Sequence, residues 1–189
     1  MRPEAGQVLH FSEDPTITVF EPHVAATAKQ PEPYVWAVDA ERSPDYWFPR
    51  RCPRAMVWAV ESTSEDDRER FLGDGDRVHA VEYGWLEAMR TAEVYAYRLS
   101  AADFEPFGGY CHVSTRTVRP LGPAERVGDL FALHEEAGIE LRILPNLWPF
   151  WDRVTASSLG FSGIRLANAC PRGQARTVIQ SQTGCIRST

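Results

Sequence analysis

Hydrophobic and polar positions alternate over several short stretches of the chain, and this alternation is typical of half-buried β-strands. In residues 93–99 (EVYAYRL), valine, alanine and arginine face one side, whereas two tyrosines and leucine face the other. Residues 77–82 (RVHAVE) alternate in the same way. Other segments are rich in β-branched or aromatic residues and are also expected to be strands: residues 8–11, 34–38, 55–60, 110–118 and 139–144.

Other segments repeat their apolar positions with a helical period. Residues 127–137 place Leu130, Phe131 and His134 on one face, and Gly138 is expected to end this helix. Shorter helices are expected at residues 45–47, 70–72, 84–90 and 146–154. Residues 24–33 and 100–109 are expected to be loops, and the second of these holds Asp103 and Glu105.

The order of these elements predicts the fold class. Most gaps between successive strands are too short for a βαβ crossover, which needs a dozen or more residues. We therefore expect an α+β fold with a mixed, mostly antiparallel, split β-sheet and short flanking helices. A single domain is expected over residues 1–169, with a helical extension at 131–169. Apolar periodicity fades after it, which predicts a poorly ordered tail at 170–189.

Composition and charge narrow the classes of function. The 189 residues are 43% hydrophobic, which suits one domain of ordinary core size. The net charge of -6 argues against a protein that holds nucleic-acid duplexes by their phosphates. Neither a signal peptide nor a membrane-spanning apolar run is visible, so a cytoplasmic protein without a membrane partner is expected. The four cysteines form no C-x-x-C pair and are expected to be mostly buried thiols.

Residues that could carry acid–base chemistry are scattered along the chain: His10, His79, Glu82, Asp103, Glu105, His112 and His134. Their spacing matches no metal-binding motif, because the second histidine of H-E-x-x-H is missing, and no metal site is expected. The sequence also lacks a G-x-S-x-G elbow, a P-loop and a G-x-G-x-x-G turn. A nucleotide, if one binds, would therefore occupy a site that is not of the Rossmann type.

Short motifs in a common order resemble small bacterial ADP-ribosyltransferases of the rifamycin-modifying type. The first, Leu9-His10-Phe11-Ser12, resembles the Y/L-H-G-T strand that opens that family. The others are residues 34–38 with Tyr46 and Trp47 after them, residues 93–99 with Phe104-Glu105 after them, residues 110–121 with Ser114-Thr115-Arg116 at their centre, and residues 127–130. The resemblance covers residues 8–130.

This resemblance implies an ADP-ribosyltransferase-like core, a small-molecule ligand and NAD as cofactor. His10 and Ser12 would hold the ribose hydroxyls, while Trp36 with Tyr46 or Tyr34 would stack on the nicotinamide. Ser114 would also contact the cofactor. Glu105 would stabilise the developing oxocarbenium ion and orient or deprotonate the acceptor, and His10 and Glu105 would be the catalytic pair.

The sequence departs from that family at two positions. Phe11 replaces the glycine after the histidine, and Trp36 replaces the tyrosine that stacks on nicotinamide. The chain as a whole also resembles an uncharacterised bacterial domain family with an H-F-S-E-D-P opening (residues 10–15) and an L-W-P-x-W-D ending (residues 147–152).

Alternatives to a transferase stay open at this point. One is a non-catalytic domain that binds a nucleotide ligand or serves as an accessory protein on the same scaffold. Another is a hydrolase or lyase that uses His10 and Glu105 as an acid–base pair. The structural alternative for His10 is a core histidine bonded to a carbonyl, and for Trp36 it is a core indole.

Overall fold

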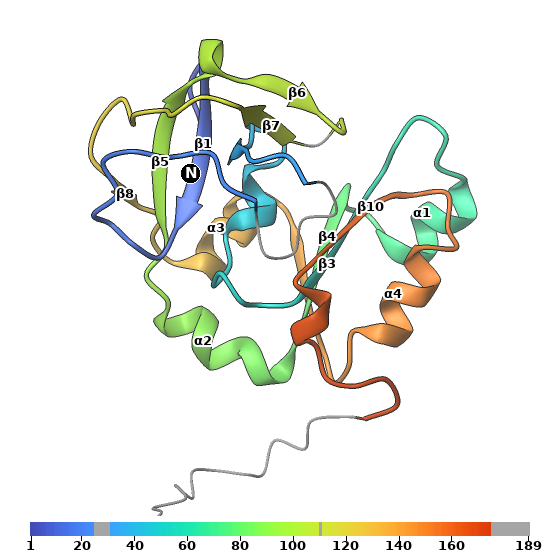
Figure 1. The fold of residues 1–189 in the computed structure, drawn as a ribbon. Coiled ribbons are helices and arrows are strands. Elements are labelled where there is room, and N and C mark those ends of the chain that lie inside the picture. The colour runs from blue at the N-terminus through green and yellow to red at the C-terminus, as the bar shows by residue number, and fades with distance from the viewer. Residues whose placement is uncertain (25–30, 110, 175–189) are drawn as a thin grey trace, which may run out of the picture. The chain divides into compact units, whose positions relative to one another are not determined.

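The computed structural model describes residues 1–24, 31–109 and 111–174 (Figure 1). The chain divides into two compact units. Unit 1 consists of Met1–Arg50 and Ala88–Gly138, and unit 2 consists of Arg51–Glu87 and Ile139–Thr189. Each unit thus draws on two separate stretches of the sequence. The expectation of a single domain over residues 1–169 stays a prediction.

The first sheet of unit 1 contains β1 (Gln7–Ser12), β5 (Tyr95–Ser100) and β8 (Glu125–Arg126), in the order β1-β5-β8. Both strand pairs are antiparallel, and His10 lies opposite Tyr97. The hydroxyl of Tyr97 accepts a hydrogen bond from the N–H of Ile17 and donates one to the carbonyl of Asp14. Tyr97 therefore fixes the turn that follows β1.

The second sheet of unit 1 contains β2 (Val35–Ala37), β7 (Cys111–Ser114) and β6 (Glu105–Phe107), in the order β2-β7-β6. Trp36 lies opposite Val113, and Val113 lies opposite Glu105. Directly opposed residues of antiparallel strands point to the same face, so these three side chains share one face of the sheet. A bridge between Leu9 and Val38 links the two sheets.

The core of unit 1 is formed from the inward faces of these strands and the segments beside them. Its buried residues are Val8, Phe20, Val35, Ala37, Tyr97, Leu99, Phe104 and Val118. The helical elements of unit 1 are η1 (Ser43–Tyr46), η3 (Ala101–Asp103) and α3 (Leu130–Glu136). Asp129 caps α3 by accepting hydrogen bonds from two backbone N–H groups, those of Phe131 and Ala132.

Unit 2 is built on one sheet with the strand order β10-β3-β4-β9. The strands are β3 (Arg54–Trp58), β4 (Arg77–Glu82), β9 (Glu140–Leu144) and β10 (Gly160–Ile164). The β4–β9 pair is parallel, whereas the other two pairs are antiparallel. The β4–β9 pairing therefore joins the two stretches of the chain that make up the unit.

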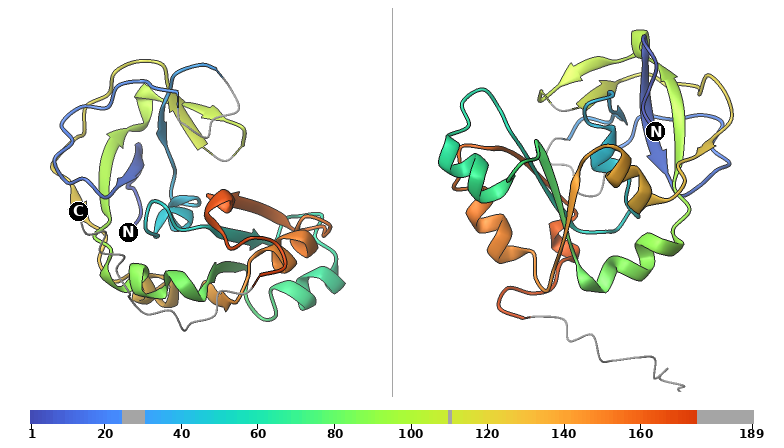
Figure 2. Two further views of the ribbon diagram at one scale, coloured as in Figure 1. Left: turned by 60° about the horizontal axis from the view of Figure 1, so that its bottom comes forward. Right: turned by 180° about the vertical axis from the view of Figure 1, so that it is seen from behind.

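Helices α1 (Glu65–Phe71) and α4 (Trp148–Val154) lie side by side against this sheet in all views of the ribbon (Figures 1 and 2). The rings of Phe71 and Phe150 meet edge to face, with centroids 6.2 Å apart. Ser64 caps α1 by accepting a hydrogen bond from the N–H of Asp67. Shorter helical segments are η2 (Tyr83–Trp85) and η4 (Leu166–Asn168), and α2 (Leu86–Thr91) spans the sequence boundary between the units.

The expected α+β fold with mostly antiparallel strands is confirmed. The loop expected at residues 100–109 is wrong, because this segment forms η3 and strand β6, so Glu105 is on a strand. The strand expected at residues 110–118 is shorter, because β7 ends at Ser114. Sequence reasoning missed β8 and β10.

Two other expectations concern segments at the limits of the described structure. Most of the expected loop at residues 24–33, namely 25–30, and most of the expected tail, namely 175–189, lie outside the described residues. Cys170, where the expected tail begins, is buried in unit 2. Within the described ranges, no helix is long and apolar enough to cross a membrane.

Candidate functional site

His10 lies on the face of β1 that points into the core of unit 1. Its ring is tilted against that of Phe20, with centroids 4.6 Å apart. Its Nδ1 lies 2.7 Å from the carbonyl oxygen of Trp36. A carbonyl can only accept, so Nδ1 carries the hydrogen of this bond and Nε2 is the basic nitrogen. This contact is the one that the structural alternative for His10 predicts.

The surroundings of His10 favour its neutral form. Burial lowers the pKa of the imidazole below its usual 6.5, and this is the largest effect. The hydrogen bond to the Trp36 carbonyl acts in the opposite direction, whereas the positive charge of Arg50 and the nearby His23 lower the pKa further. At pH 7 the ring is therefore neutral and can accept a hydrogen bond through Nε2.

A small cavity of about 60 Å³ adjoins His10 and is called the His10 cavity here. Its lining residues are Leu9, His10, Phe11, Trp36, Ala37, Val38, Tyr46 and Cys111. The rings of Phe11 and Tyr46 are stacked with centroids 6.1 Å apart, and the Tyr46 hydroxyl lies 4.0 Å from Sγ of Cys111. Because one water takes about 30 Å³, the cavity admits a small group and not a whole nucleotide.

Three aromatic rings cluster on the face of the second sheet that carries Trp36. The centroid of Trp36 lies 5.8 Å from that of Tyr34 and 5.4 Å from that of Phe107, both at nearly right angles. Tyr34 and Phe107 are 5.5 Å apart. All three side chains are half-buried, so their rings combine packing with access to solvent.

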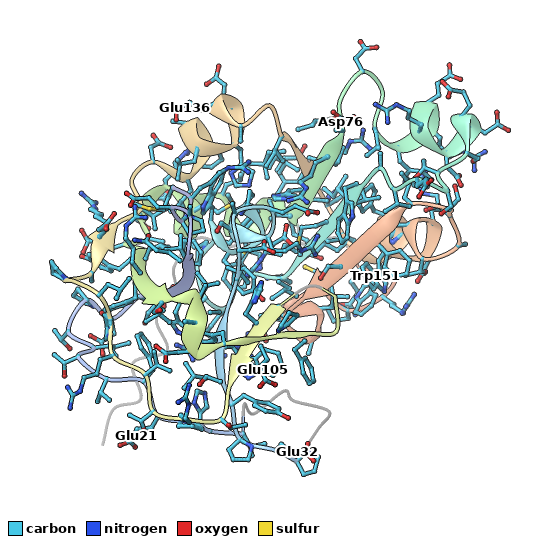
Figure 3. All side chains as sticks on the ribbon, turned by 90° about the horizontal axis from the view of Figure 1, so that it is seen from above. Glu21, Glu32, Asp76, Glu105, Glu136 and Trp151 are labelled. Carbon is cyan, nitrogen blue, oxygen red and sulfur yellow. The ribbon has the colours of Figure 1, made fainter. Side chains whose placement is uncertain are left out.

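A second, more polar pocket of about 220 Å³ lies at the end of this sheet and is called the Arg116 pocket. Its lining residues are Tyr34, Ala102, Asp103, Phe104, Glu105, Pro106, Phe107, Val113, Ser114, Thr115 and Arg116. The guanidinium of Arg116 lies 3.5 Å from the carboxylate of Asp103. Glu105 is exposed on β6 (Figure 3), and within the described part of the chain no hydrogen bond or ion pair to its carboxylate is found.

The two serines proposed as cofactor contacts are both engaged in local turns. Ser12 is buried, and its hydroxyl accepts a hydrogen bond from the N–H of Asp14. Ser114 is also buried, and its hydroxyl accepts from the N–H of Arg116 and lies 3.3 Å from the carbonyl of the same residue. These bonds fix the backbone at the start of each turn, so that Ser114 holds Arg116 at the rim of its pocket.

The structure thus divides the expected site residues between two pockets. His10, Trp36 and Tyr46 come together in the His10 cavity. Glu105 and Ser114 line the Arg116 pocket, and Ser12 lines neither of the two. Contact between the rings of Trp36 and Phe107 connects the pockets, because each ring belongs to a different one.

Sequence reasoning missed Phe107 and Cys111 as lining residues. The Gly108-Gly109 pair between them is a sequence signal for a tight turn between two strands. Both glycines adopt positive φ in the structure. Strand alternation would then have placed Phe107 on the same face as Glu105. Pro106 between them weakened the signal, although proline is tolerated on an edge strand such as β6.

Three other acid–base candidates lie outside the two pockets and contact backbone groups or a neighbouring side chain. His134 is buried, and its Nδ1 donates to the carbonyl of Leu130. Nε2 of His112 lies 3.5 Å from the carboxylate of Asp39. The buried carboxylate of Glu82 accepts hydrogen bonds from backbone N–H groups of unit 2. Over residues 1–24, 31–109 and 111–174, no group of His, Cys, Asp or Glu side chains is arranged to hold a metal ion.

Comparison with protein families supplies one match. The model of a family of unknown function (DUF6886) matches residues 9–169, and the chain belongs to this family. No curated protein and no solved structure matches the chain. The match includes both the opening motif at residues 10–15 and the ending motif at residues 147–152, so the expected membership of an uncharacterised family is confirmed.

Proposed function

We propose that this protein binds NAD through unit 1, on an ADP-ribosyltransferase-like scaffold, and transfers the ADP-ribosyl group to an acceptor. One observation carries the proposal. His10, Trp36 and Tyr46 come from three separate elements, β1, β2 and η1, and line one cavity. These are the residues for which the resemblance implied contact with the nicotinamide–ribose end of the cofactor.

The two pockets suggest how NAD would be accommodated. Ligand sites for molecules of drug size commonly measure about 300–1,000 Å³, so the His10 cavity would hold only the nicotinamide–ribose end of NAD, and the Arg116 pocket would stay open to the acceptor. The nicotinamide end of NAD would lie between His10 and the rings of Trp36 and Phe107. The cationic nicotinamide ring would lie against these aromatic faces, and Nε2 of His10 would accept a hydrogen bond from a ribose hydroxyl.

Glu105 would act on this ribose from the side of the Arg116 pocket. It lies two strands away from Trp36 in the row through Val113, so their Cα atoms are about 10 Å apart at the usual strand spacing. In the proposed reaction the glycosidic C–N bond breaks and neutral nicotinamide leaves with the electron pair. The acceptor bonds to C1′ and releases a proton, while the carboxylate stabilises the cationic ribose.

A second candidate function is nucleotide binding without catalysis. It is favoured by the position of Glu105, which lines a different pocket from His10. The same separation gives no support to a hydrolase or lyase that uses His10 and Glu105 as a direct acid–base pair.

Calorimetry and thermal shift with NAD, ADP-ribose and nicotinamide test the binding step. We expect saturable NAD binding that His10→Ala and Trp36→Ala weaken at least tenfold. His23→Ala is the matched control, because His23 is an exposed histidine of unit 1 that lines neither pocket. Circular dichroism of each ligand-free variant checks that it folds. Absence of binding at millimolar NAD would refute the proposal.

Nicotinamide release, followed by chromatography, separates the two candidate functions. With water as acceptor, the transferase converts NAD to ADP-ribose, nicotinamide and a proton. Glu105→Gln is expected to retain NAD binding and to lose most of this release. A wild-type protein that binds NAD and releases no nicotinamide, with or without added amines, would support the non-catalytic function instead.

A further inference from the structure

We propose that the Arg116 pocket binds a cationic group, an amine or a guanidinium, and that this group belongs to the acceptor of the proposed transfer. The assignment to an acceptor rests on the proposed function. Binding of the cation itself does not, because it depends only on the charges and rings of this pocket.

The balance of charge in the pocket favours a cation. Asp103 and Glu105 carry two formal negative charges, and Arg116 carries one positive charge. Arg116 pairs with Asp103 at 3.5 Å, which leaves the carboxylate of Glu105 without a partner among the described residues. A cation beside Glu105 would neutralise the pocket, whereas an anion would meet two carboxylates and only one guanidinium.

The walls of the pocket add a second attraction for a cation. Tyr34 and Phe107 line it with half-buried rings whose centroids are 5.5 Å apart. The face of an aromatic ring carries negative electrostatic potential and attracts ammonium and guanidinium groups. Buried Phe104 contributes further apolar surface. Carboxylate and aromatic faces together are the usual surroundings of a bound organic cation.

The size and position of the pocket are also suitable. About 220 Å³ equals the share of roughly seven waters, which is enough for a guanidinium or a primary amine with part of its stem. Phe107 lines this pocket and contacts Trp36 of the His10 cavity. A cation bound here would therefore hold the rest of the acceptor beside the nicotinamide end of the proposed NAD path.

Arg116 provides a test whose sign separates a cation site from an anion site. Its guanidinium repels a cationic ligand and pairs with the carboxylate of Asp103. Arg116→Ala should therefore strengthen binding of a cation, because two unpaired carboxylates then face the pocket. If the pocket instead holds an anion, such as the diphosphate of a nucleotide, the same substitution should weaken binding. Arg116 is 72% exposed, so its removal should leave the fold intact.

The experiment measures binding in the absence of NAD, by calorimetry and by NMR titration of the whole chain. The cationic probes are agmatine and a capped Ala-Arg-Ala peptide, and the neutral control is the same peptide with citrulline. We expect the arginine peptide or agmatine to bind, and citrulline not to bind at the same concentrations. Glu105→Gln should weaken binding about fivefold, the upper end for an exposed ion pair. Arg116→Ala should strengthen it by a similar factor.

Glu135→Gln is the matched control, because Glu135 is an exposed carboxylate of α3 in unit 1 that does not line the pocket. Tighter binding of the peptide than of agmatine would point to a protein side chain as acceptor, and the reverse to a small amine. Equal binding of citrulline and arginine, or binding of inorganic pyrophosphate that Arg116→Ala abolishes, would overturn the inference. Cation binding without any NAD binding would instead sink the proposed transferase and leave the cation site standing.

Discussion

Glu82 offers the sharpest test of how unit 2 is held together. It is the last residue of β4, it is 1% exposed, and its carboxylate accepts hydrogen bonds from the N–H groups of Leu147 and Cys170. Both of these residues are buried as well. One side chain therefore links the start of α4 and the segment at Cys170 to the sheet of unit 2.

Glu82→Ala removes the acceptor from both N–H groups. A buried group that loses its partner costs about 1–3 kcal/mol, so two such groups give a loss of about 2–6 kcal/mol in the free energy of unfolding. Glu82→Gln should cost less than Ala, because its carbonyl still accepts from one N–H while its amide opposes the other. Glu69→Ala, at an exposed position of α1, should change stability by about 0.5 kcal/mol or less.

Urea unfolding followed by tryptophan fluorescence measures these differences. Trp148 is a suitable reporter, because its indole N–H donates to the carbonyl of Cys170. The midpoint should fall in the order wild type, Gln, Ala, with an unchanged slope. A loss below about 1 kcal/mol for Glu82→Ala would mean that water or another acceptor satisfies the two N–H groups, and the account of Glu82 as a tie would be wrong.

Three further predictions follow from burial and packing. Burial lowers the pKa of His10, so NMR titration of its imidazole should give a pKa below 6.5. The contribution of His10 to the free energy of unfolding is then complete above pH 6.5 and decreases as the pH falls below that value. A pKa at the usual 6.5 would contradict this prediction. Burial raises the pKa of Cys52 to about 12, so iodoacetamide at pH 8 should leave this thiol unmodified in the folded protein and label it after unfolding, as mass spectrometry would show. Gly163→Ala should lower the free energy of unfolding by about 1–3 kcal/mol, because its methyl carbon would lie 2.7 Å from the Trp151 ring; an unchanged urea midpoint would refute the clash.

The sequence was most informative where one local pattern dominated. The alternation in residues 77–82 predicts a strand, and β4 has the same bounds. The sequence did not predict strands whose formation depends on contacts between residues distant in the chain. Strand β10 reads GFSGI, and its glycines indicate a turn when only the sequence is considered. In the structure Gly160 and Gly163 give room to the rings of Trp58 and Trp151, which no local pattern reveals.

The candidate site was predictable in its parts and not in its arrangement. The sequence predicts His10 and Trp36 on strands and Glu105 in a loop, and the structure places all three residues in one unit. Their distribution between two pockets depends on the pairing of β2 with β7 and of β7 with β6, which the sequence does not specify. Because the sequence predicts a loop at residues 100–109, it does not reveal the face that Trp36 and Glu105 share.

The interleaving of the two units sets an order on folding during synthesis. All the segments of unit 1 are complete once residue 138 has been made, whereas unit 2 at that point holds only β3 and β4 of its sheet. The parallel partner β9 and the edge strand β10 follow later, at Glu140–Leu144 and Gly160–Ile164. The antiparallel β3–β4 pair therefore has both edges open while more than fifty residues of the other unit are made. Such edges attract other strands, so this interval is when the nascent chain is most exposed to mispairing.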